Sequence, residues 1–398
     1  MHRKAMTMNR RFYFSFLAFA LTVATAIAFV AGNSTSKGAG LSSSAAAALP
    51  ASDFVVIVDV QRALNDALPT LLTSNPAALA KFNAHLAEFE TKTGINPRVF
   101  ESVAIGGSLR PNARLGRDPG AVVIASGSFK ADEMLAAAFD AAKKECQFEK
   151  TEQQYEGKTI FVISSVRRLT TRETNEPATA MVTPSGAAGV APDPSKDSTA
   201  SVRSSISILE GHPSARLGVL HSSSDNFAVA ALAPNMIAVG SVESVRASID
   251  ASLGRNRIDG EMVNLALENP NTIVGFSGRI PQNSQKTDAT NLGIPIANFF
   301  ASIREFHGSF GLSGSDTESS IAVQLETSEQ AREFSQAINS IKGLASFGVA
   351  QSVGPDQASR DAIAAVLKGL TINATGNELR IDLKIPQSTL APLIRLHR

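Results

Sequence analysis

The sequence predicts an α+β fold of two related lobes, each with a mainly antiparallel sheet and helices packed on one face. Three observations predict it. Short turns join neighbouring strand-like runs, as in antiparallel hairpins. Apolar residues recur at helical spacing in the segments between these hairpins. The order strand, helix, strand, strand, helix, strand, strand occurs twice, in residues 49–254 and again in 271–398, which suggests an internal repeat.

The first lobe, residues 49–254, opens with an apolar strand-like run at 54–60. A helix follows, which Asn75 can cap, Pro76 suits as a first-turn residue and Gly94 can end. The remaining elements expected in this lobe are strands 100–109 and 121–129, helix 132–144, strands 147–155, 159–164, 227–232 and 236–240, and a helix capped by Ser241.

The second lobe, residues 271–398, repeats this order. Thr327 and Gln330 form a capping box ahead of a helix with a buried apolar face. The other expected elements are strand 273–280, helix 296–306, strands 307–312 and 320–326, helix 362–368, and the hairpin 370–374 with 379–385. In the last strand, apolar residues alternate with Arg380, Asp382 and Lys384, which is typical of a sheet with one solvated face.

The N-terminus has the pattern of an export signal. Five basic residues among the first eleven precede an uncharged apolar stretch at 12–32. As a helix this stretch would rise about 31 Å, so residues 1–32 could be a cleaved signal peptide or an uncleaved signal anchor. We expect the rest of the chain to be extracytoplasmic: periplasmic, secreted, or anchored to the membrane through 12–32.

Two segments lack the pattern of a packed element. Residues 33–48 are mostly Ser, Ala and Gly without periodicity, which predicts a flexible tether after the export signal. Residues 165–205 contain few Val or Leu and no aromatic residue, with clusters of Pro, Ser and Gly. Too little apolar surface is present there to offset the cost of ordering the chain, so we expect a disordered insertion.

Composition excludes several classes of function. The 37 lysines and arginines nearly balance the 36 aspartates and glutamates, so no overall positive field exists to hold a nucleic acid. The one cysteine, Cys146, rules out an intrachain disulfide and a thiolate zinc cage. The six histidines never fall at the spacing of a helical metal pair. We therefore expect no metal and no other cofactor.

Three arginines crowd a loop expected between two strands. Arg110, Arg114 and Arg117 lie there with Pro111 and Gly116. Guanidinium groups so placed could hold phosphate or anionic lipid headgroups, and we infer these three as candidate ligand-binding residues. The alternative is a solvated loop whose charges only keep it soluble. The sequence suggests no residue as catalytic with comparable support, and no metal ligand.

A histidine and a serine two residues apart are the nearest approach to a hydrolase motif. His307 and Ser309 would share one face of a strand, and Asp316 or Glu318 would have to orient the imidazole. The Gly-x-Ser-x-Gly motif of serine hydrolases is absent. The pair therefore allows two interpretations. The protein could be a weak serine hydrolase centred on Ser309, or the segment could be a strand edge that tolerates glycine.

Asp59 interrupts an apolar strand-like run, and its carboxyl group allows two interpretations. A carboxyl group buried in such a strand could act as a functional acid with a raised pKa. Alternatively, the side chain caps the helix that follows or points to water.

Three stretches carry a resemblance to known proteins: 49–59 (LPASDFVVIVD) after the export signal, 155–160 (YEGKTI) and 235–241 (NMIAVGS). They resemble segments of uncharacterised exported bacterial envelope proteins that contain a domain of unknown function. The resemblance would cover most of the chain after Leu49. It implies an exported, duplicated α+β fold, and it implies no catalytic residue.

These observations lead to a functional expectation. We expect a non-enzymatic envelope protein that binds a protein or lipid partner through a sheet face or the groove between its lobes. One alternative is a carrier of lipid or another apolar ligand, with a phenylalanine-lined cavity between helices and sheet. The other alternative is the weak serine hydrolase.

Overall fold

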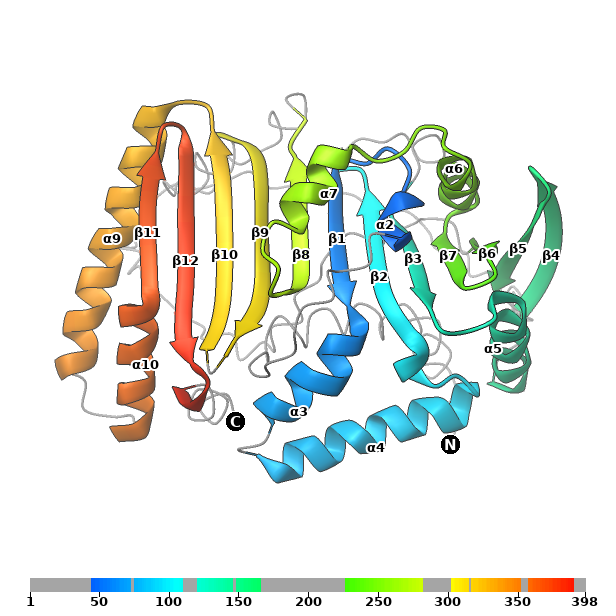
Figure 1. Cartoon of the computed structure of the whole chain (residues 1–398), viewed down its shortest axis with the longest axis horizontal. Helices are drawn as coiled ribbons and strands as arrows, with labels where there is room; N and C mark the ends of the chain where they lie inside the picture. Colours follow the sequence, from blue (N-terminus) through cyan, green and yellow to red (C-terminus); the bar gives the residue numbers. More distant parts are fainter. Residues whose placement is uncertain are drawn as a thin grey trace, which may run out of the picture. The chain divides into compact units, whose positions relative to one another are not determined.

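A computed structural model shows a single antiparallel sheet of twelve strands in the described part of the chain (Figure 1). The strand order is β11-β12-β10-β9-β8-β1-β2-β3-β7-β6-β5-β4. The signal segment 1–32, most of the tether and insertion residues 166–205 lie outside the described residues. The structure describes residues 44–72, 75–109, 120–145, 148–165, 226–281, 302–314, 316–351 and 357–389.

The expected α+β class with a mainly antiparallel sheet is confirmed. The strands of the first half are β1 (Phe54–Asp59), β2 (Phe100–Gly107), β3 (Val122–Gly127), β4 (Phe148–Tyr155), β5 (Lys158–Ser165), β6 (Asn226–Ala233) and β7 (Met236–Gly240). Those of the second half are β8 (Thr272–Arg279), β9 (Ile303–Ser313), β10 (Asp316–Leu325), β11 (Leu370–Thr375) and β12 (Glu378–Pro386). Residues 303–306, expected to end a helix, belong to β9 instead.

The two halves share one sheet because β1 pairs with β8 as well as with β2. The expected lobes 49–254 and 271–398 are therefore joined, and all the described residues belong to one compact unit. Pairing satisfies the backbone N–H and C=O groups that β1 and β8 would otherwise leave open at a sheet edge. Outward from this pair the order is repeated: three strands in sequence, then the hairpin β5-β4 on one side and β12-β11 on the other. In the first half, the hairpin β6-β7 lies between β3 and the hairpin β5-β4.

Local signals in the sequence explain several helix ends. The Asn75 side chain accepts a hydrogen bond from the Ala78 N–H at the start of α4, and Gly94 ends that helix with φ 70°. Thr327 and Gln330 form both hydrogen bonds of the capping box before α9. The helices are α2 (Ser44–Ala47), α3 (Leu68–Leu71), α4 (Pro76–Thr93), α5 (Ala131–Glu145), α6 (Val242–Ser252), α7 (Gly260–Ala266), α9 (Ser328–Gln351) and α10 (Gln357–Gly369).

Helices cover both faces of the sheet in the first half, whereas the sequence suggested one. Residues of α3, α4 and α5 pack against Val58 and Val103 on one face. Residues of α2, α6 and α7 pack against Val55 and Ile57 on the other. Both faces are covered because the side chains of β1 are apolar on either side of the sheet, and each side must be shielded from water.

The end of the expected tether is part of this core. Ala45 and Ala46 in α2 are fully buried, and α2 lies against β2 and β3. Small alanine side chains allow this close approach, so residues 44–48 are packed although they lack an amphipathic pattern. Within the described residues, no helix combines the length and apolarity needed to cross a bilayer.

Candidate functional site

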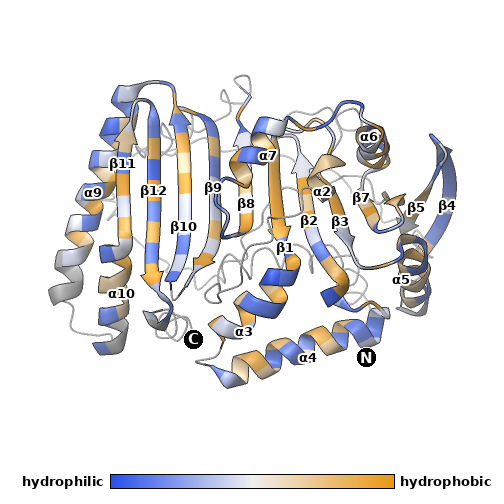
Figure 2. Cartoon of the chain, in the orientation of Figure 1, coloured by the Kyte–Doolittle hydropathy of each residue, from blue (hydrophilic) through white to orange (hydrophobic). Residues whose placement is uncertain are grey.

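In the second half, no helix of the described residues packs on one face of β10, β12 and β11, whereas α7 packs beside them on β8 and β9. Val323, Leu325 and Leu379 point to the face that α9 covers, and α10 packs beside α9. Neighbouring residues on the same strands point the opposite way, where no described helix packs on β10, β12 or β11. Figure 2 shows the resulting alternation of hydrophobic and hydrophilic residues along β12 and β10. The expected solvated face of the last strand therefore extends to β11 and part of β10, where Asn373 and Gln324 are exposed, whereas Ala322 of β10 and Ser309 of β9 on the same face are buried.

We call this surface the open face and define it by the strand register. His307, Ala322, Arg380 and Asn373 lie opposite one another across β9, β10, β12 and β11. The next row on the same face contains a serine from β9, a serine from β10, an aspartate and a threonine. The open face consists of Glu305, His307, Ser309, Asp316, Glu318, Ser320, Ala322, Gln324, Thr371, Asn373, Thr375, Glu378, Arg380, Asp382 and Lys384.

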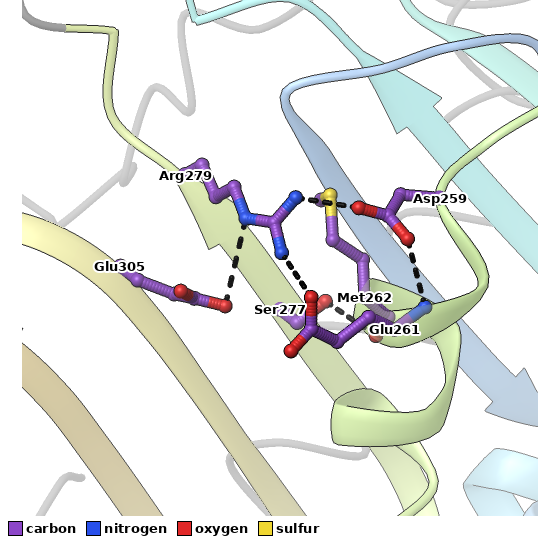
Figure 3. Close-up of polar contacts among 6 residues, drawn as sticks. All are labelled: Asp259, Glu261, Met262, Ser277, Arg279 and Glu305. Atoms are coloured by element: carbon purple, nitrogen blue, oxygen red, sulfur yellow. Dashed lines mark hydrogen bonds and ion pairs between the residues drawn. The ribbon is translucent and has the colours of Figure 1, made fainter.

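Helix α7 borders the open face through a cluster around Arg279 (Figure 3). The guanidinium group lies 2.6 Å from the Asp259 carboxylate, 2.7 Å from that of Glu261 and 3.7 Å from that of Glu305. Asp259 also caps α7, since it accepts a hydrogen bond from the Glu261 N–H at 2.9 Å. This backbone bond, with the bond from Arg279, lowers the pKa of Asp259. The cluster ties α7 to β8 and β9.

A second cluster lies where β9, β10 and β12 meet the turn after α7. The Glu268 carboxylate is 3.4 Å from His307 Nε2 and 3.9 Å from Arg380 Nη2. Arg380 Nε also donates a hydrogen bond to Glu378 at 3.2 Å. These contacts order the side chains in the middle of the open face and connect it to the segment between α7 and β8.

A third cluster centres on Lys384 at the far end of β12. Its ammonium group donates a hydrogen bond to Glu318 at 2.7 Å and lies 3.6 Å from the carboxylate of Asp316. The hydrogen bond to Glu318 raises the pKa of Lys384. Beside this cluster, the Ser320 hydroxyl donates to Asp382 at 2.7 Å. Three cations thus hold most of the carboxylates of this region in place.

The structure places His307 and Ser309 on one face of β9, as expected, but does not build a catalytic triad from them. No hydrogen bond between the two residues occurs among the described contacts. The acid beside the imidazole is Glu268, whereas Asp316 and Glu318 bind Lys384. The suggestion that one of those two acids orients His307 is therefore wrong.

Asp59 is a helix cap in the structure. Its Oδ1 atom accepts a hydrogen bond from the Arg62 N–H at 2.9 Å, where a π-helical turn over Arg62–Ala67 begins. Burial raises the pKa of this carboxyl group, more than the contacts with Arg62 lower it. Arg110, Arg114 and Arg117 lie outside the described residues, so their binding role stays a prediction, as does the carrier of apolar ligands.

Sequence reasoning missed most of the residues that build the three clusters. Arg279, Glu268 and Glu305 come from different elements and carry no motif. Only the alternation along β12 pointed to Arg380 and Lys384 as residues of a solvated face. Their carboxylate partners become neighbours through strand pairing, which the spacing along the chain does not reveal.

Comparisons with known proteins give little more. No protein-family model matches the chain, and no curated protein matches it. Among solved structures, crystal form I of TP0453 is 10% identical with a TM-score of 0.37, covering 88% of this chain and 96% of that chain. Crystal form III of TP0453 is also 10% identical, with a TM-score of 0.39 and coverage of 91% and 99%. Likeness at this level supports no conclusion about the function of this chain.

Proposed function

We propose that this chain is a non-enzymatic envelope protein that binds a protein partner through the open face. The observation that carries the proposal is a sheet face that displays paired polar side chains and on which, among the described residues, no helix packs over β10, β12 and β11. In the first half, the corresponding side of the sheet is covered by α2, α6 and α7. Because the described helices leave β10, β12 and β11 uncovered on this side, the surface suits contact with another molecule.

The open face is already organised for binding. Its charged side chains project from paired strands and are held by ion pairs and hydrogen bonds. Side chains fixed before association lose less conformational entropy when a partner binds. This preorganisation supports a binding role for the surface.

The sheet edges suit a partner less well than the open face. On the edge strand β11, the carbonyl groups of Leu370 and Ile372 accept hydrogen bonds from Lys342 and Asn339 of α9. The other edge strand, β4, exposes alternating charges that oppose the addition of another strand. The proposal therefore places the partner on the face of the sheet.

The envelope location is part of the proposal and rests on the N-terminal sequence. Basic residues ahead of the apolar stretch 12–32 favour transfer of the following chain across a membrane. If this stretch is not cleaved, the binding domain would be tethered to the membrane surface. Either form would present the open face outside the cytoplasm.

Photo-crosslinking in the producing cell tests the proposal. A photoreactive amino acid at Gln324 or Asn373, both exposed on the open face, should give a discrete crosslinked product. Matched controls are Gln336 on α9 and Asn83 on α4, which are exposed on the helical side of the molecule. Products of equal yield at all four positions, or none at the open face, would overturn the proposal.

A further inference from the structure

We infer that the partner of the open face is a protein segment rich in lysine and arginine. This inference rests on the proposed function and adds the chemistry of the partner. Two observations support it. The strand register and α7 bring an excess of carboxylates to one surface, and each cation on that surface is paired with more than one carboxylate. The partner's cations would meet a surface with a marked excess of carboxylates.

The open face, residues 259–268 around α7, and Arg279 of β8 together carry eight carboxylates but only three permanently cationic side chains. With His307 neutral, the excess is five negative charges, although the whole chain has a formal net charge of +1. The Arg304–Glu326 pair at the end of β9 adds one charge of each sign. The carboxylates belong to Asp259, Glu261, Glu268, Glu305, Asp316, Glu318, Glu378 and Asp382, and the cations to Arg279, Arg380 and Lys384.

Each cation on this surface is shared by more than one carboxylate. Arg279 contacts three, and Arg380 and Lys384 contact two each. Every cluster therefore keeps a net negative charge after its internal ion pairs have formed. Added cations from a partner would be attracted to all three clusters, and complementary charge both speeds association and selects the partner.

The spacing of the clusters favours an extended polycation over a metal ion. Among the described residues, no three side chains of His, Cys, Asp or Glu converge closely enough to hold a metal. The three clusters instead lie along the surface from α7 across β9, β10 and β12. Glu261 and Glu268 are more than half exposed, so a partner can reach them without displacing the sheet side chains.

Fluorescence anisotropy with labelled decalysine tests this inference on the full chain. The open-face variant Glu261→Gln, Glu268→Gln, Glu318→Gln removes one charge from each cluster and should weaken binding about tenfold. The control variant Glu88→Gln, Glu133→Gln, Glu152→Gln removes three ion-paired carboxylates elsewhere and should leave affinity within about twofold. Binding of decalysine to the unchanged chain should weaken as salt is added.

The outcomes separate this inference from the proposed function. Equal weakening by both variants, or no binding of decalysine, would overturn the basic partner. If the crosslinked products at Gln324 and Asn373 form as well in the open-face variant as in the unchanged chain, the face binds a partner that is not basic. Loss of those products in this variant alone supports both claims. Unchanged circular dichroism would show that the variants are folded.

Discussion

Replacing Gly275 with alanine is expected to lower the free energy of unfolding by about 3 kcal/mol. Gly275 lies in β8 directly under α7. A Cβ atom built on it would be 1.8 Å from the Ala266 carbonyl oxygen and 3.1 Å from the Thr272 side chain. The helix would have to move away from the sheet, which would strain the Ser277 hydroxyl bond to the Met262 carbonyl. Urea denaturation followed by circular dichroism measures the change.

Gly343 provides the matched control for this substitution. It lies within α9, and nothing lies within 4 Å of a Cβ atom built there. Gly343→Ala should therefore raise the free energy of unfolding by about 0.5 to 1 kcal/mol, because alanine favours a helix interior over glycine. Equal stability of the two variants would show that α7 does not approach β8 as closely as described.

Replacing Ile57 with alanine is expected to cost about 2 to 5 kcal/mol of unfolding free energy. Ile57 is fully buried in β1, the strand that pairs with β2 of the first half and β8 of the second. The truncated side chain would leave a cavity under α2 and α7. Because β1 connects both halves, the variant should still unfold in one transition at a lower urea concentration.

The same substitution at an exposed isoleucine serves as a control, because it removes the same atoms without creating a buried cavity. Ile341 on α9 is 64% exposed, and Ile341→Ala should change the free energy of unfolding by no more than about 0.5 kcal/mol. Calorimetry on Ile57→Ala then decides how the halves are coupled. Two resolved transitions would mean that the halves unfold independently. That result would contradict a single sheet shared by both halves.

The parts of the fold that the sequence predicts well depend on neighbours along the chain. Asn75 and Gly94 bound α4 through contacts within four residues, and so do Thr327 and Gln330 before α9. The alternation in β12 likewise reports which side chains face the same way. Such signals need no knowledge of distant segments.

The arrangement of these elements depends on pairing between distant segments. Nothing near β1 in the sequence indicates that β8 is its partner, and this pairing turns two expected lobes into one sheet. Residues 303–306 carry apolar side chains at a spacing that also fits a helix, yet pairing with β8 and β10 makes them part of a strand. Tertiary pairing here outweighs local preference.

The candidate site shows the same limit. The acid next to His307 is Glu268, which precedes β8, because the turn after α7 folds over β9. Local spacing suggested Asp316 or Glu318 instead. Arg279 likewise gathers Asp259 and Glu261 at the start of α7 and Glu305 of β9. These clusters combine helix capping between near neighbours in the sequence with contacts between paired strands. The sequence can indicate the capping, but it does not indicate which strands pair.

Cysteine labelling measures whether the open face is accessible to solvent. In a chain whose one cysteine is removed by Cys146→Ala, Thr371→Cys and Gln324→Cys place a thiol on the open face. Ile372→Cys places a thiol on the opposite face of β11, next to Thr371, where Ile372 is buried in the core beneath α9. The two open-face thiols should react with maleimide at nearly the rate of the unfolded chain, and the Ile372→Cys thiol far more slowly. Equal protection at all three positions would instead show that the open face is covered, and a binding role for an exposed sheet face would be wrong.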